Sequence, residues 1–361
     1  MKKNKRLKPE KRNKKSKELQ SSYKIRWTTY LLLVIDFCAV VSFVLMYGPF
    51  SFFRDWFVTS SMWTGQHRYF ARTFFTEEGI MLVLKNNAIK SVDEDTDIGN
   101  IEIGNWQSDG NYSSIYEQQI LERDFDNQEY KIIEISENRA NGWLIVIYDP
   151  SRVSLATANR INNGGNVGSD IAKQYDATVF INASAYSRSG GKLIPHGTTI
   201  QDGKVVSIGK NMKYTDFAIG IIGFTHDDKL VLCKDTQENI TKYNFRDAVT
   251  FGPTLIVNGK ASETSGKAGG MNPRAAIGQR KDGIVLFLII DGRSSKNGVG
   301  ANFNDLTQIF LRYGAVNAAN LDGGGSTTLI VEGQLVNRPC GAGSCGYGVM
   351  ERYIPNGWIF K

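Results

Sequence analysis

A carboxylate and a glycine-rich turn adjoin at Asp322, which three glycines and two hydroxyl residues follow directly. Glycine tolerates positive φ and leaves no Cβ between the main chain and a ligand, and successive N–H groups in such a turn converge on an anion. This combination suits cleavage of a bond beside a phosphate or a sugar. A tight turn between two strands, capped by Asp322, explains the segment equally well when it is taken alone. The residues concerned are Asn320, Asp322, Gly323, Gly324, Gly325, Ser326 and Thr327.

Asp291 is a second carboxylate at the end of an apolar run. Residues 284–290 are apolar throughout, which predicts a central strand covered on both faces, and Asp291 and Arg293 follow it. Residues 315–321 lead into Asp322 in the same way. If a helix over residues 302–313 connects the two strands, they are parallel and both carboxylates emerge at one edge of the sheet. The alternative is an ion pair at a strand end.

Arg274 is a candidate phosphate ligand because of the proline before it. Pro273 fixes its own φ and biases Asn272 towards an extended backbone, so Arg274 stands on a stiff main chain. A guanidinium held in this way binds phosphate through two parallel hydrogen bonds. A surface salt bridge is the alternative.

Asn182 ends another predicted strand, and Tyr186 follows in a polar loop. An amide there orients a sugar hydroxyl and a phenol ring stacks on a sugar, although a plain turn also explains both residues. His196 lies in the loop Ile-Pro-His-Gly, the most site-like position among the three histidines. The chain contains no His-Glu-x-x-His, Gly-x-Ser-x-Gly or phosphate-loop motif. This argues against a zinc protease, an esterase and a nucleotide hydrolase.

Short apolar runs separated by Gly, Asn and Asp predict one β-rich α+β domain with a mixed sheet over residues 131–361. Asn258-Gly259 and Asp202-Gly203 have the composition of hairpin turns. The predicted strands cover residues 143–148, 178–182, 198–200, 205–208, 217–224, 230–232, 254–257, 284–290, 315–321, 328–331 and 357–360.

Two helices are expected in this domain. One covers residues 169–175, with Ser169 as its cap. The other covers residues 302–313, with Asn304 or Asp305 as its cap and an apolar stripe on one face.

The net charge of +7 is concentrated in residues 1–26, which are rich in Lys and Arg. A basic segment alone is compatible with nucleic acid or anionic lipid. A largely apolar run over residues 28–47 follows, and a helix of that length reaches about 30 Å, the thickness of a hydrocarbon core. The pattern predicts a cytoplasmic tail over 1–26, a transmembrane anchor over 27–48 and an extracytoplasmic remainder. Membrane lipid is then a partner through residues 1–48, and nucleic acid is not.

A cleaved signal peptide is the rival to the anchor, but its apolar stretch normally has about 7–15 residues and ends in small ones. Residues 49–130 are aromatic at first and then polar and acidic, which predicts a juxtamembrane segment and a stalk. Near the C-terminus, Cys340 and Cys345 bracket four small residues. They suit a disulfide loop outside the cytoplasm, with two free thiols as the alternative.

Four motifs occur in a fixed order: Asn-Pro-Arg-Ala-Ala-Ile-Gly at 272–278, Ile-Ile-Asp-Gly-Arg at 289–293, Asn-Leu-Asp-Gly-Gly-Gly-Ser-Thr at 320–327, and Glu-Arg at 351–352. Together they resemble the phosphodiester glycosidase family, over residues 131–361. The resemblance implies an enzyme that hydrolyses a sugar-1-phosphodiester in an envelope polysaccharide or glycoconjugate. The N-terminal anchor is similar to that of bacterial membrane-bound members.

In this interpretation, Asp322 or Asp291 is the nucleophile or general base, and Glu351 is an acid or a supporting residue. The resemblance fixes no cofactor, and a divalent cation bridging Asp322 and the phosphate is the one candidate. The substrate is held by Arg274, Arg293, Asn182, Asn320, Tyr186, His196 and the turn from Gly323 to Thr327.

The family usually has Asn-Gly-Gly-Phe-Phe where this chain has Asn-Ala-Ser-Ala-Tyr at 182–186. This departure supports an alternative function, a non-catalytic protein that binds anionic glycan during exopolysaccharide or cell-wall assembly.

Overall fold

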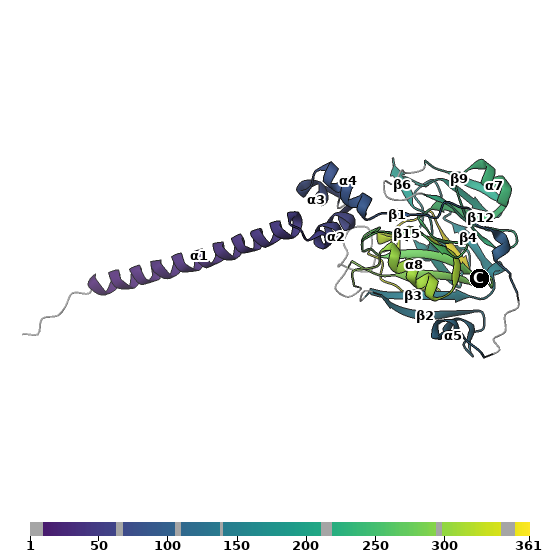
Figure 1. The fold of residues 1–361 in the computed structure, drawn as a ribbon, viewed down its shortest axis with the longest axis horizontal. Coiled ribbons are helices and arrows are strands. Elements are labelled where there is room, and N and C mark those ends of the chain that lie inside the picture. The colour runs from purple at the N-terminus through teal and green to yellow at the C-terminus, as the bar shows by residue number, and fades with distance from the viewer. Residues whose placement is uncertain are drawn as a thin grey trace, which may run out of the picture. The chain divides into compact units, whose positions relative to one another are not determined.

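The computed structural model describes residues 10–62, 68–104, 110–137, 140–210, 219–293, 298–340 and 351–361, with the backbone alone for 10–26 and 137. The chain divides into two compact units, Met1–Arg54 and Asp55–Lys361. The first contains one long helix, α1 (Glu10–Tyr47) (Figure 1). Its stretch Trp27–Tyr47 is long and apolar enough to cross a membrane, by length and composition.

The second unit contains short helices around three sheets. The remaining helices are α2 (Ser51–Met62), which begins in the first unit, α3 (Arg68–Phe74), α4 (Glu77–Asn86), α5 (Ile115–Leu121), α6 (Gly168–Gln174), α7 (Gln237–Tyr243), α8 (Phe303–Arg312) and the 3-10 turns η1 (Ile98–Asn100), η2 (Pro150–Arg152) and η3 (Gly324–Ser326).

The largest sheet has seven strands and carries most of the residues of interest. Its order is β14 (Lys260–Ala261), β13 (Thr254–Val257), β18 (Ala315–Asn320), β16 (Arg274–Arg280), β17 (Val285–Ile290), β3 (Ala140–Ile147) and β2 (Tyr130–Glu137).

Two five-stranded sheets and two short ribbons complete the fold. One sheet has the order β20 (Gln334–Leu335), β19 (Leu329–Val331), β5 (Val179–Asn182), β21 (Asn356–Phe360) and β4 (Val153–Thr157). The other has the order β11 (Leu230–Cys233), β10 (Gly220–Thr225), β12 (Phe245–Phe251), β8 (Thr198–Gln201) and β9 (Lys204–Ile208). The ribbons pair β1 (Ile89–Lys90) with β15 (Glu263–Thr264), and β6 (Tyr186–Ser189) with β7 (Lys192–Pro195).

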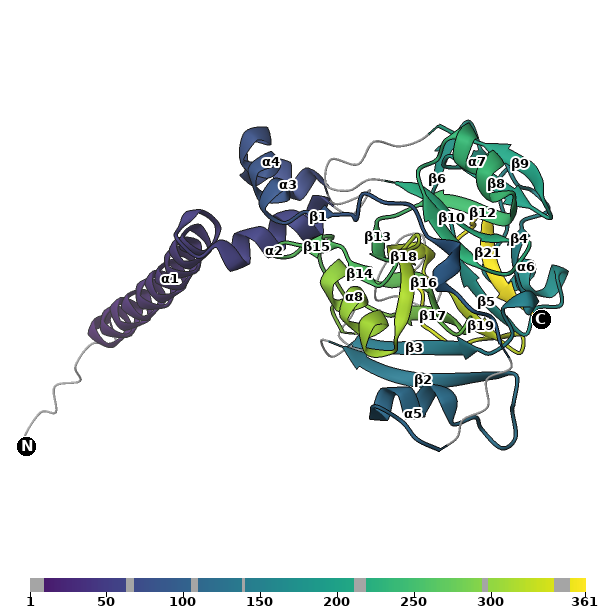
Figure 2. The same cartoon turned by 45° about the vertical axis from the view of Figure 1, so that its right-hand side comes forward.

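The central strands β16 and β17 of the seven-stranded sheet are buried on both faces. Helix α8 covers one face (Figure 2). Its Leu306 and Phe310 belong to the same buried hydrophobic cluster as Leu288 of β17. On the other face, Phe287 belongs to a core shared with both five-stranded sheets, in which Trp358 is fully buried. Burial on both faces explains why residues 284–290 are apolar without alternation.

The order of three strands brings the predicted site residues to one edge of this sheet. Strand β16 lies between β17 and β18 and is antiparallel to both, so β17 and β18 are parallel and α8 connects them. Arg274 pairs with Ile290, and the Leu321 amide donates to the Ala275 carbonyl at 2.8 Å. The expected crossover is therefore present, and β16 begins where β17 and β18 end.

The helix caps differ from those expected. Asn302 caps α8 and forms a capping box with Asp305, so the cap lies before the two residues predicted for it. Helix α6 has no side-chain cap from its own N-cap residue. Ser169 instead donates its amide to Glu351 Oε1 at 2.8 Å, so a distant carboxylate covers this helix end.

The described parts of residues 88–130 pack against the sheets of the second unit, to which they belong, and do not form the expected stalk. Strand β1 pairs with β15, and the Thr96 amide donates to the Leu232 carbonyl at 3.0 Å. In α5, Ile120 is fully buried in the core beneath β3. Acidic composition suggested solvent exposure, but a few apolar residues fix this segment in place.

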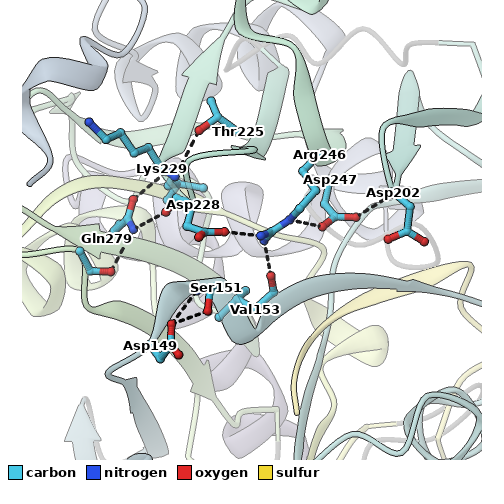
Figure 3. Close-up of polar contacts among 12 residues, drawn as sticks. Asp149, Ser151, Val153, Asp202, Thr225, Asp228, Lys229, Arg246, Asp247 and Gln279 are labelled. Atoms are coloured by element: carbon cyan, nitrogen blue, oxygen red, sulfur yellow. Dashed lines mark hydrogen bonds and ion pairs between the residues drawn. The ribbon is translucent and has the colours of Figure 1, made fainter. Parts of the chain in front are cut away.

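A buried network around Arg246 ties the three sheets together (Figure 3). Its guanidinium donates to Asp247 Oδ2 at 3.0 Å, and also to Asp228 and to the Val153 carbonyl at the start of β4. Gln279 of β16 in turn donates to the Asp228 carbonyl at 2.9 Å. Asp247 is fully buried, and its burial raises its pKa although Arg246 opposes the shift.

Candidate active site

The glycine turn after β18 forms η3, and close packing explains its composition. A Cβ on Gly323 would lie 2.6 Å from the Pro273 carbonyl oxygen, and Gly324 has φ +63°. The amide of Gly324 donates to that same carbonyl at 2.8 Å. The amides of Ser326 and Thr327 donate within the turn, both at 3.3 Å. These three N–H groups are engaged, so anion binding here falls largely to side chains.

Asp322 is held by the end of β5, a strand of another sheet. Its amide donates to the Ala183 carbonyl at 2.9 Å, and its carbonyl accepts from Asn182 Nδ2 at 2.5 Å. Burial raises the pKa of the Asp322 carboxyl to about 6, although Ser326, Arg352 and Arg293 each lower it. A carboxyl of this kind is largely ionised at neutral pH and still basic enough to take a proton.

Arg293 and Arg352 reach the glycine turn from different segments. A Cβ on Gly324 would lie 3.2 Å from an Arg293 nitrogen, and one on Gly325 would lie 3.5 Å from an Arg352 nitrogen. Arg293 has φ +59°, a left-handed conformation that costs a side-chain-bearing residue free energy. Two guanidiniums beside a carboxylate form a site for a substrate that is anionic on one side.

Three buried hydroxyl groups lie in this part of the site. Among the described residues, Tyr186 Oη, Ser326 Oγ and Thr327 Oγ1 have no partner with good hydrogen-bond geometry, although Ser326 is near enough to Asp322 to lower its pKa. Burial raises the pKa of Tyr186, and the charge of Asp322 raises it further. Buried polar atoms normally have partners, so these three atoms are suited to contact a bound ligand.

His196 follows β7 and contacts β6. Its Nε2 is 2.9 Å from Ser187 Oγ, and its Nδ1 is buried and makes no hydrogen bond to the described residues. Burial lowers its pKa, so the ring is neutral at neutral pH. His196 is thus fixed on one side by β6.

Arg274 has partners other than a phosphate. It is buried, and its guanidinium donates to the carbonyls of Ala301, Gly269 and Gly270 at 2.9, 2.5 and 2.8 Å. It also lies over the Phe303 ring at 4.5 Å. These contacts favour a role for Arg274 in holding the loop before β16. The guanidinium that lies at the glycine turn is that of Arg293.

The two other predicted acids also have structural partners. Asp291 is buried, accepts from Asn337 Nδ2 at 3.0 Å and accepts from the Arg338 amide at 3.0 Å. Burial raises its pKa while these donors lower it. Glu351 accepts from Ser169 through both carboxylate oxygens. Asp291 therefore fixes the segment after β20, and Glu351 fixes the segment that carries Arg352.

Two amides support the turn. Asn182 is buried, and besides holding Asp322 its Oδ1 accepts from the Thr328 amide at 3.0 Å. Asn320 donates to the Gly252 carbonyl at 2.8 Å, and its Oδ1 is buried with no partner among the described residues.

The structure thus brings Asp322, Tyr186, Arg293 and Ser326 together, and it adds Arg352. Sequence reasoning quoted Arg352 within the Glu-Arg motif but assigned the role to the glutamate. The sequence signal that could have identified Arg352 was its position directly after Glu351 in this motif.

Two further predictions concern a metal ion and a disulfide. The described residues include no cluster of three or more His, Cys, Asp or Glu side chains arranged to hold a metal ion. The divalent cation at Asp322 stays a prediction. Cys340 is buried, and Cys345 lies outside the described residues, so the disulfide also stays a prediction.

The model of the phosphodiester glycosidase family matches residues 175–361, about half of the chain, and includes every residue of this site. The chain belongs to the phosphodiester glycosidase family. A member in Bacillus subtilis, an uncharacterized SPbeta prophage-derived protein, is 30% identical over 194 residues. That match covers 52% of this chain and 29% of the relative.

Another relative is the N-acetylglucosamine-1-phosphodiester alpha-N-acetylglucosaminidase of Bos taurus, 26% identical over 188 residues. The match covers 47% of this chain and 34% of that enzyme, so the chain spans about a third of the curated relatives it matches. Among solved structures, the catalytic domain of the zebrafish enzyme, auto-inhibited by its pro-peptide, aligns with a TM-score of 0.51 at 20% identity. It covers 64% of this chain and 82% of that domain, and establishes the fold.

Proposed function

We propose that this protein is a membrane-anchored, extracytoplasmic glycosidase that hydrolyses a sugar-1-phosphodiester in an envelope polysaccharide or glycoconjugate. The observation that carries the proposal is Asp322, whose pKa is raised to about 6 between two arginines. Family membership supports the hydrolase class.

The proposed reaction breaks the bond between the anomeric carbon and a phosphate oxygen. Ionised Asp322 either attacks the anomeric carbon or removes a proton from the attacking water. The bonding electrons pass to the phosphate oxygen, and water supplies the hydroxyl of the released sugar. Retention of configuration in that sugar indicates attack by Asp322, whereas inversion indicates activation of water.

The chemistry of the leaving group explains why one catalytic carboxylate is sufficient for the proposed hydrolysis. Ordinary glycosidases use a second carboxylic acid to protonate an alkoxide leaving group. A phosphate ester is a weak base and departs as an anion, so charge stabilisation replaces protonation. Arg293 and Arg352 are placed to supply it at the turn, which leaves Asp291 and Glu351 to their structural contacts.

The N-terminal helix supports the location. Residues 1–26 are basic and precede Trp27–Tyr47, which favours a cytoplasmic N-terminus and an enzyme domain outside. Protease protection in sealed, right-side-out vesicles tests this, because the domain is digested from outside only in that orientation.

The activity test uses the full chain in nanodiscs and a set of UDP-sugars. We expect release of free sugar by the wild type and at least about a 10²-fold loss in Asp322→Asn. Saturable binding of anionic glycan with no sugar released would favour the non-catalytic alternative. Unchanged turnover in Asp322→Asn would remove this residue from the mechanism.

A further inference from the structure

We propose that helices α2 and α4, which precede the family-matched region, position Arg293 for phosphate binding, with Asn87 as the central positioning residue. The inference rests on the proposed function for its kinetic readout. A continuous set of contacts runs from these helices to the glycine turn.

The first contacts join the helices to the loop before β16. Asn87 is buried and follows α4. Its Nδ2 donates to Asp55 Oδ2 of α2 at 3.0 Å and to the Val83 carbonyl of α4 at 2.8 Å. Its Oδ1 accepts from the Lys267 amide at 2.6 Å. One side chain thus fixes two helices and the start of the loop over residues 265–272.

Helix α2 also touches this loop directly. Gly270 has φ +60°, and a Cβ there would lie 3.0 Å from the Ser60 amide nitrogen. A side chain at this position is both strained and obstructed, so the loop and the helix are packed backbone to backbone.

The loop then orients Arg293 through Asn272. Asn272 Nδ2 donates to the Gly269 carbonyl at 2.9 Å, which fixes its amide. Its Oδ1 accepts from Arg293 Nε at 3.2 Å and from a terminal nitrogen at 2.5 Å. Arg293 has φ +59°, so its guanidinium depends on this acceptor for its direction towards Gly324. Arg274 holds the same loop by donating to Gly269 and Gly270.

This path of contacts predicts that substitution of Asn87 affects Arg293 through the loop between them. Asn87→Ala removes the acceptor of the Lys267 amide and the side-chain link from the loop to both helices, whereas the backbone contact of α2 at Gly270 and the residues at the glycine turn remain. Because Arg293 is proposed to bind the phosphate of the substrate and to stabilise its charge as it departs, we expect KM to rise about tenfold and kcat to fall as well. A purely structural loss would lower the amount of active enzyme and leave KM unchanged.

The decisive measurement is a double-mutant cycle on the full chain in nanodiscs. In an Arg293→Gly background, Asn87→Ala should change KM by less than about twofold, because the group that it positions is gone. An equal effect of Asn87→Ala in both backgrounds would overturn the proposal.

Amide hydrogen exchange separates this proposal from the proposed function. Asn87→Ala should speed exchange in residues 265–274 whether or not any sugar phosphodiester is turned over. The matched control is Asn239→Ala, a buried asparagine of α7 that donates to the Lys234 carbonyl at 3.1 Å. It should leave exchange in that loop and KM unchanged. Unaltered exchange at 265–274 in Asn87→Ala would refute the positioning role even if the enzyme is active.

Discussion

Asn182 holds both sides of the glycine turn, since it donates to the Asp322 carbonyl and accepts from the Thr328 amide. Asn182→Ala leaves two main-chain groups in a buried site without partners. We expect the free energy of unfolding to fall by about 1–3 kcal/mol. We also expect kcat/KM to fall by more than about tenfold, because the backbone of Asp322 loses its hydrogen bond to Asn182 and its carboxylate is displaced. Thermal unfolding and turnover of the same preparation measure the two effects. An active, equally stable variant would contradict this assignment.

The pH dependence of kcat/KM should follow Asp322. The carboxyl must be ionised to act, and its pKa is raised to about 6. Activity should therefore be low below this pH, rise through it and level off above it. Arg352 lowers this pKa, so Arg352→Met should move the rising limb to higher pH as well as weaken binding. If the rising limb of the pH profile is unchanged in Arg352→Met, the limb reports the titration of a group other than Asp322.

Arg293→Gly separates catalytic need from stability. Glycine relieves the left-handed φ of +59°, so the melting temperature should stay constant or rise, despite the lost bond to Asn272. KM for the phosphodiester should rise by about 10–100-fold, since a charged hydrogen bond is removed. A stabilised protein with weakened binding is the expected combination, whereas wild-type KM would exclude contact with substrate.

Arg246 is predicted to matter for folding alone. Arg246→Met leaves Asp247 buried without its charged partner, which costs about 3–5 kcal/mol. The melting temperature of the full chain in detergent should drop by about 5–15 °C, with KM unchanged in the folded fraction. Lys260→Ala breaks an exposed pair with Glu94 and serves as the control, with a shift close to zero.

Truncation tests whether residues 49–130 belong to the domain. A chain that begins at residue 131 lacks α5 and β1 and uncovers the core that Ile120 fills. It should aggregate, whereas a chain of residues 49–361 should be soluble and folded, as judged by size-exclusion chromatography and near-UV circular dichroism. Soluble, folded protein from the shorter chain would contradict this packing.

Sequence reasoning identified the family, the α+β class, the crossover helix and most strands, because apolar runs and turn dipeptides are local signals. Asn258 and Asp202 both have positive φ, as their hairpin turns require. Strand β12 was missed because Arg246 and Asp247 interrupt its apolar pattern, and their charges are neutralised only by residues distant in sequence.

The same limit applies to the site. Asp322 was predicted at the turn, and Arg293 was predicted as a substrate ligand after the strand over residues 284–290. The structure brings the Arg293 guanidinium to the turn beside Asp322. Arg274, Asp291 and Glu351 have equally suggestive sequence positions, but their partners are carbonyls and amides whose location depends on the whole fold. No local pattern distinguishes a charge that faces substrate from one that faces the main chain.

The place of β21 within its sheet has a consequence for folding. It lies between β4 and β5, and Asn356 pairs with Thr157, about 200 positions earlier in the chain. Loop closure over that distance comes before any compensating contact, so folding should be slow. Until β21 inserts, β4 and β5 present unpaired edges that attract other chains. A chaperone that shields strand edges should therefore raise the yield of active protein more than one that only prevents collapse of apolar side chains.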